Sequence, residues 1–280
     1  MATEMKPFRP QRAESGACPR EYAQVARAVA TLARYTFIEA LRSNFVAVAA
    51  VVIVCVGALG QFFAELALTD AAAIRALSMA WILRVAAVFL LAAFAISTVV
   101  RDQNDKGLEL LLALPWPRAG YLMGKWLGCA ATGILLAFMF TVALALAAPL
   151  PGVAAWGLSL ALEMLVVASA GVLCALTFRH VVGSLAAVAA FYALCRTMGA
   201  LLAIGASRHA PADSAAFRAA NLALEGIAAL LPRLDMFTRS QWLADGHAPL
   251  HDLGMVFLQA AVATAVLLTA ALIDLSRKSV

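Results

Sequence analysis

Six long apolar stretches, separated by short polar segments, make up most of this chain. Each is long enough to form a helix across a bilayer core roughly 30 Å thick, which takes about 20 apolar residues. The pattern therefore predicts an all-α polytopic membrane protein with six transmembrane helices. The predicted spans are residues 45–63, 76–100, 126–150, 153–178, 181–206 and 253–273.

The polar residues before the first span follow two patterns. Residues 1–22 are predicted to form a disordered cytoplasmic tail. Residues 23–43 are predicted to form an amphipathic helix in the headgroup plane, although they could instead extend the first span. Its two faces would carry Gln24, Arg27, Thr31 and Arg34 on one side and Val25, Val29 and Leu32 on the other.

Composition excludes an ordinary soluble domain, because 64% of the residues are hydrophobic and only 13% are charged. The five cysteines show no CxxC spacing, and the four that lie inside apolar stretches are interpreted as packing residues. Lys and Arg residues gather in 1–43, in 101–125 and at 277–278. In membrane proteins, basic residues are concentrated in cytoplasmic loops and tails. This pattern therefore predicts that both termini and segment 101–125 face the cytoplasm. The net charge of +5 reports this topology and gives no reason to expect a nucleic-acid partner.

Segment 101–125 combines charged residues with an apolar stripe at helical spacing. Pro115 and Pro117 are expected to end a first short helix, and a second is expected to begin near Arg118 and to continue into the third span. Gly120, Gly124 and Gly128 recur every four residues in that second helix, which permits close approach of another helix. We predict a rigid helix across the cytoplasmic ends of two spans. The alternative is a basic loop that only sets topology.

The same segment resembles the first cytoplasmic loop of type-2 ABC transporter permeases. In that family an acidic residue precedes a Gly-Thr-Leu-Glu-like run, followed by a proline, a basic residue and Gly-Lys; this chain lacks the threonine. The layout of an interfacial helix, six spans and a long external loop at 207–252 resembles the family as well. The resemblance implies that ten residues of this segment couple the permease to its ATPase. They are Asp102, Lys106, Gly107, Leu108, Glu109, Leu111, Leu112, Pro115, Arg118 and Lys125.

The resemblance implies an exporter subunit in a bacterial inner membrane. Two permease subunits, identical or homologous, would pair, and two ABC ATPase subunits would dock on their cytoplasmic loops. ATP and Mg²⁺ would bind to the ATPase. This chain is expected to have no cofactor and no enzymatic activity of its own. Residues 120–126 superficially resemble a phosphate-binding loop but have three residues between the glycines and a tryptophan after the lysine.

Two ionisable residues, Glu163 and Arg196, lie about 15 Å inside the predicted fourth and fifth spans. We interpret them as a mutual ion pair or as the lining of a translocation pathway. Arg84 is expected to extend outward, toward Glu65. No metal site is expected, because Pro249 disfavours a helix that would bring His247 and His251 together.

The external loop 207–252 contains an interrupted apolar run, 221–231, that ends at Pro232. This run fits a short surface helix or an ordinary loop. Leu231–Phe237 and Trp242 would then lie at the membrane interface.

Two other classes of function remain open from the residues alone. One is a secondary transporter in which Glu163 or Asp274 carries protons, although matched Gly/Pro-broken spans are not evident. The other is a non-transporting scaffold that relays ATPase motion to a periplasmic assembly.

Overall fold

The computed structural model describes residues 19–67, 70–105, 118–205, 226, 232–237, 241–244 and 249–277, and these residues form helices, turns and no strands. Six of the helices are long and apolar enough to cross a membrane. They are α2 (Phe45–Leu66), α3 (Ala71–Asn104), α5 (Arg118–Ala145), α6 (Leu150–Phe178), α7 (Val181–Gly205) and α10 (Leu250–Arg277). The predicted all-α, six-span class is confirmed.

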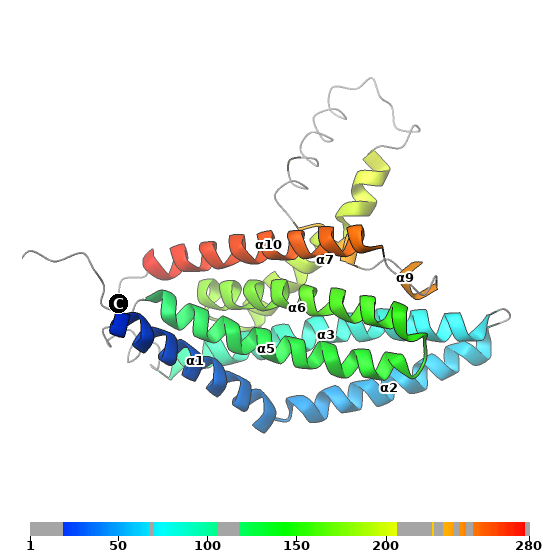
Figure 1. Cartoon of the computed structure of the whole chain (residues 1–280), viewed down its shortest axis with the longest axis horizontal. Coiled ribbons are helices and arrows are strands. Elements are labelled where there is room, and N and C mark those ends of the chain that lie inside the picture. Colours follow the sequence, from blue (N-terminus) through cyan, green and yellow to red (C-terminus); the bar gives the residue numbers. More distant parts are fainter. Residues whose placement is uncertain are drawn as a thin grey trace, which may run out of the picture.

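A separate helix, α1 (Pro19–Arg42), precedes the first span. It begins four residues earlier than expected, so residues 19–22 are helical and do not belong to a disordered tail. A turn at residues 43–44 divides α1 from α2, and the two helices run in different directions (Figure 1). The segment therefore does not extend the first span. Its expected polar face is exposed, whereas its apolar face is partly buried and packs mainly against α5.

The central helix of the bundle is α6, which packs against α3, α5, α7 and α10. Figure 1 shows α6 running alongside α5 and α10, with α2 at the edge of the bundle. The side chains of Leu160, Met164 and Val166 on α6 are completely buried. By contrast, α2 and α10 expose large apolar side chains such as Val54 and Phe257. Such faces suit contact with lipid or with another membrane subunit.

The connection between α5 and α6 differs from the short one implied by the predicted spans 126–150 and 153–178. Helix α5 ends at Ala145, and α6 already begins at Leu150 with Pro151 in its first turn. Proline is well tolerated there because the first backbone N–H groups of a helix have no partner within the helix. The next connection, residues 179–180, is as short as the sequence indicated, and Arg179 takes a left-handed conformation with φ 57°.

Two short helices from the segment between α7 and α10 pack onto the bundle. These are η1 (Leu234–Phe237), which lies against α7 and α6, and α9 (Gln241–Ala244), which lies against α6 and α3. Their apolar side chains Leu234, Phe237 and Trp242 are buried. Phe237 and Trp242 thus pack against helices of the bundle, and their expected position at the depth of the membrane interface stays a prediction. Only Gly226 of run 221–231 is among the described residues.

Candidate coupling site and buried charge cluster

The first candidate site lies where α3 ends and α5 begins, on either side of segment 106–117. Asp102 lies in the last turn of α3, and Tyr121 and Lys125 are one helical turn apart on α5. Lys125 Nζ lies 2.8 Å from Asp102 Oδ2, and Tyr121 Oη donates a hydrogen bond of 3.0 Å to the same oxygen. Because the Lys125 side chain is only 4% exposed, its charge depends on this carboxylate for compensation.

Further polar contacts join the end of α3 to two other helices. Arg101 forms an ion pair with Glu39 of α1. Gln103 Nε2 donates a hydrogen bond of 3.2 Å to the carbonyl oxygen of Ala175, in the last turn of α6. The last turn of α3 is therefore tied to α1, α5 and α6 at once.

Close packing between α1 and α5 completes this arrangement. A Cβ added at Gly128 would lie 2.5 Å from Thr36 Cβ and 2.9 Å from the carbonyl oxygen of Ala33. A Cβ added at Gly124 would lie 2.9 Å from Leu32 Cδ2. The regular glycine spacing in the sequence thus marks a helix contact, and its partner is α1. We call the contacts among α1, α3, α5 and α6 described so far the junction.

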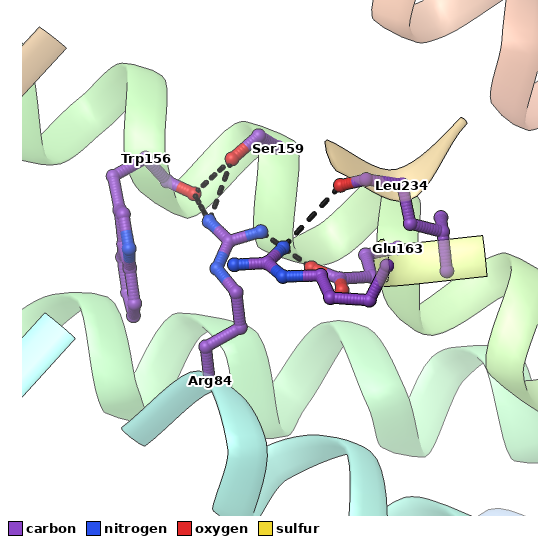
Figure 2. A network of polar contacts seen from close by, with 6 residues as sticks. Arg84, Trp156, Ser159, Glu163 and Leu234 are labelled. Atoms are coloured by element: carbon purple, nitrogen blue, oxygen red, sulfur yellow. Dashed lines mark hydrogen bonds and ion pairs between the residues drawn. The ribbon is translucent and has the colours of Figure 1, made fainter. Parts of the chain in front are cut away.

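The second candidate site is a buried charge cluster in the middle of the bundle. Arg84 of α3 and Glu163 of α6 form an ion pair in which the side chains are 1% and 0% exposed. Arg84 Nη2 also donates to Ser159 Oγ at 2.9 Å and to the carbonyl oxygen of Trp156 at 3.4 Å. Its guanidinium carbon lies 5.2 Å from the centroid of the Trp156 ring, within the range of a cation–π contact (Figure 2).

Arg196 joins the edge of this cluster from α7. Its Nη1 donates a hydrogen bond of 3.3 Å to the carbonyl oxygen of Leu234 in η1, drawn as a dashed line to Leu234 in Figure 2. Arg196 lies within electrostatic range of Arg84, and Tyr192 lies within electrostatic range of both Arg84 and Glu163. The cluster therefore brings together α3, α6, α7 and η1.

Comparison with known protein families matches residues 30–205 to the ABC-2 family transporter proteins. The chain belongs to the ABC-2 family. Comparison with curated proteins gives no match. Membership makes the chain a multi-pass permease component of an ABC transporter, a membrane subunit that associates with ABC ATPase subunits. The matched region contains α2 to α7 and most of α1, including the junction and the charges that Arg84, Glu163 and Arg196 contribute to the cluster.

The structure places the expected coupling residues of the ABC-2 chain in two groups. Asp102 and Lys125 are paired in the junction. Arg118 begins α5, and its side chain lies outside the described residues. The other expected coupling residues lie in segment 106–117, which the structure does not describe, so their coupling role stays a prediction. They are Lys106, Gly107, Leu108, Glu109, Leu111, Leu112 and Pro115.

The predicted pairing of Glu163 with Arg196 is wrong, because Glu163 pairs with Arg84 and Arg196 binds a backbone carbonyl. The expectation that Arg84 reaches outward to Glu65 is wrong as well, because Arg84 is buried and Glu65 is exposed. The error came from the start of the second span. Helix α3 begins at Ala71, five residues before the predicted span, so Arg84 lies more than three turns inside the helix. Tyr121 was also missed, although its spacing of four residues from Lys125 places both on one face of α5.

Proposed function

We propose that this ABC-2 permease component is an exporter subunit that converts ATP-driven motion of two ATPase subunits into movement of its transmembrane helices. It would pair with a second permease subunit, identical or homologous. Segment 101–125 would receive the ATPase on the cytoplasmic side of a bacterial inner membrane, with both termini on that side. Nucleotide and Mg²⁺ would be bound by the ATPase.

The observation that carries this proposal is the junction. The helices on either side of segment 106–117, α3 and α5, are joined by the contact of Asp102 with Lys125 and Tyr121. A force applied to the segment would therefore reach α3 and α5 together, instead of bending one of them. Both α3 and α5 contact α1, so the force would spread to the interfacial helix. The contact of α3 with α6 would carry it to the centre of the bundle. Packed interiors resist gradual deformation, so the helices would move as rigid elements.

The main alternative to ATP-driven coupling is proton-driven transport through Glu163, and the charge cluster supports it poorly. A proton carrier must exchange protons with water, whereas the Glu163 side chain is 0% exposed and is held by a buried arginine. We therefore assign Glu163 a structural role, and Arg196, which is only partly buried, remains the candidate for the pathway lining.

The test of coupling uses two substitutions in segment 106–117, Glu109→Lys and Leu111→Asp. Reversing an interfacial charge or removing an apolar anchor typically weakens protein association by about 2–4 kcal/mol. We expect both variants to insert into the membrane normally. Permease-stimulated ATP hydrolysis, measured on the purified complex with its ATPase in lipid, should fall at least about tenfold.

Matched controls are the same changes on the other side of the membrane, Glu225→Lys and Leu222→Asp, which should keep full stimulation. Undiminished stimulation in the Glu109 and Leu111 variants would contradict the proposed docking site. ATP-dependent movement of substrate into liposomes containing the complex would distinguish an exporter from a scaffold that only relays motion.

A further inference from the structure

A small cavity lies where the start of α10 meets η1. It has a volume of about 100 Å³ and is lined by Met236 of η1 and by His251, Asp252, Met255 and Val256 of α10. The start of α10 is at the end of the bundle away from the junction (Figure 1). The cavity is therefore separate from both candidate sites described above, and it has room for an ion with a few water molecules.

Three side chains of this cavity carry atoms that bind soft metal ions. Met236 and Met255 each have a thioether sulfur, and His251 has an imidazole ring. His251 and Met255 are one helical turn apart, so they lie on one face of α10. Met236 comes from η1, which is anchored on the bundle by the buried side chains of Leu234 and Phe237. Donors from two separately anchored elements thus line one cavity.

Two neighbouring side chains orient these donors. Gln259 Nε2 donates a hydrogen bond of 3.5 Å to the sulfur of Met236, which still has a second lone pair. Asp252 Oδ1 lies 3.7 Å from His251 Nδ1. A carboxylate beside one ring nitrogen favours the tautomer that carries its proton on that nitrogen, which leaves Nε2 to bind a metal. Many metal-binding histidines are oriented by a carboxylate in this way.

The exposure of two of the donors is unusual for residues that only fill space. Methionine in a packed interior adapts to irregular gaps, and the partly buried Met236 suits that role. Met255, by contrast, is 42% exposed, and the His251 side chain is 85% exposed. His251 is also the second residue of α10, so it lies at the end of the span. An ion could therefore reach both side chains without separating the helices.

We propose that Met236, His251 and Met255 bind a cuprous ion at this end of the bundle. Thioether sulfur is a soft, uncharged donor that favours Cu(I), whereas Mg²⁺ and Ca²⁺ take oxygen ligands. The bound ion would fasten η1 to the last span. Common metal motifs are built from cysteine, histidine and carboxylate residues, so a set of two methionines and one histidine from two elements has no sequence signature. Cu(I) binding here goes beyond the proposed ATPase coupling and does not depend on it.

The test measures Cu(I) binding to the purified full-length protein without oxygen, in competition with a coloured Cu(I) chelator. The five cysteines are replaced by alanine, because thiolates bind Cu(I) themselves. Met236→Leu, Met255→Leu and His251→Gln should each raise the dissociation constant at least about tenfold, since each removes one ligand. Leucine nearly keeps the volume of methionine, so the first two changes disturb packing little.

Matched controls remove the same atoms elsewhere. Met139→Leu changes a partly buried methionine of α5, and His180→Gln changes an exposed histidine in the turn before α7. Both should leave the dissociation constant within about twofold of the wild-type value, because they do not line the cavity. Unchanged Cu(I) affinity in Met236→Leu and Met255→Leu would overturn the proposal. Tighter binding of Zn²⁺ than of Cu(I) would overturn the identity of the ion.

A second readout keeps the native cysteines and uses Ag(I), which shares the soft-ligand preference of Cu(I). A ion that binds only the folded state raises the thermal unfolding temperature. Ag(I) should therefore raise that temperature more in the wild-type protein than in Met236→Leu or Met255→Leu, whose cysteines are unchanged. An equal rise in all three proteins would count against the site, whether or not the cysteine-free protein folds well.

Discussion

At the scale of single residues, the Arg84–Glu163 pair has the largest expected effect on stability. Both side chains are almost fully buried, so each charge is tolerated only because of the other. Ser159 and the carbonyl oxygen of Trp156 take up further N–H groups of Arg84. Removing one partner leaves an uncompensated charge, whereas removing both leaves an apolar or neutral contact between α3 and α6.

We expect Arg84→Met or Glu163→Gln alone to destabilise the protein by about 3–5 kcal/mol and to lower the yield of folded protein. The double variant should recover most of that yield. The measurement is the amount of monodisperse protein after detergent extraction, together with its thermal unfolding temperature. Arg196→Gln serves as the comparison and should cost less, because Arg196 is only partly buried and donates a hydrogen bond to a backbone carbonyl oxygen. Equal losses for the double and single variants would refute the pairing.

At the scale of elements, the contact between α1 and α5 links the interfacial helix to the transmembrane bundle. It depends on the absence of side chains at Gly124 and Gly128, which lets the backbone of α1 approach. A new Cβ at Gly128 would come closest to Thr36 Cβ and to the carbonyl oxygen of Ala33, which both belong to α1. Because a backbone atom cannot turn away as a flexible side chain can, α1 itself would have to shift.

We expect Gly128→Ala to displace α1 from α5 and to cost about 1–3 kcal/mol of stability, as overpacking generally does. Gly57→Ala on α2 is the matched control, because a Cβ there meets nothing within 4 Å, and it should be neutral or slightly stabilising. Thermal unfolding of the two purified variants in the same detergent makes the comparison. An equal unfolding temperature for Gly128→Ala and the wild type would show that α1 is not held in this position.

At the scale of the whole molecule, the orientation in the membrane determines whether an ATPase can reach the junction. Basic residues concentrate in 1–43, in 101–125 and at 277–278. The start of α1, the junction and the end of α10 lie toward the same end of the bundle (Figure 1). The described helix ends that adjoin the basic regions thus lie toward one end of the bundle, as expected if basic loops and tails are retained in the cytoplasm.

We expect cysteines introduced as Ser15→Cys and Asn104→Cys, in a background without the native cysteines, to be protected from an impermeant thiol reagent in intact cells. A cysteine introduced as Ser214→Cys should react. Reaction of all three after membrane permeabilisation is the control for accessibility. Labelling of the Asn104→Cys variant from outside would reverse the orientation and remove the proposed coupling role of segment 101–125.

The sequence by itself determined the elements of this protein. Hydropathy and helical periodicity are local properties, so they were sufficient to identify six spans and the short connection at 179–180. They also favoured an amphipathic α1, but only the structure showed that α1 is separate from the first span. The charge and proline pattern of 101–125, with the layout around it, also identified the ABC-2 family. These features are decided by the residues within one element and by the surrounding bilayer.

Only the tertiary structure decided which charges meet. Arg84 and Arg196 both lie within spans near the depth of Glu163, and choosing between them requires the rotation and the packing of α3, α6 and α7. Likewise, the spacing of Gly124 and Gly128 indicated a helix contact but not that α1 is the partner. Asp102 and Lys125 meet because α3 and α5 come together at the junction, although many residues separate them along the chain. Such contacts depend on how several helices fill space together, and no pattern within one helix specifies them.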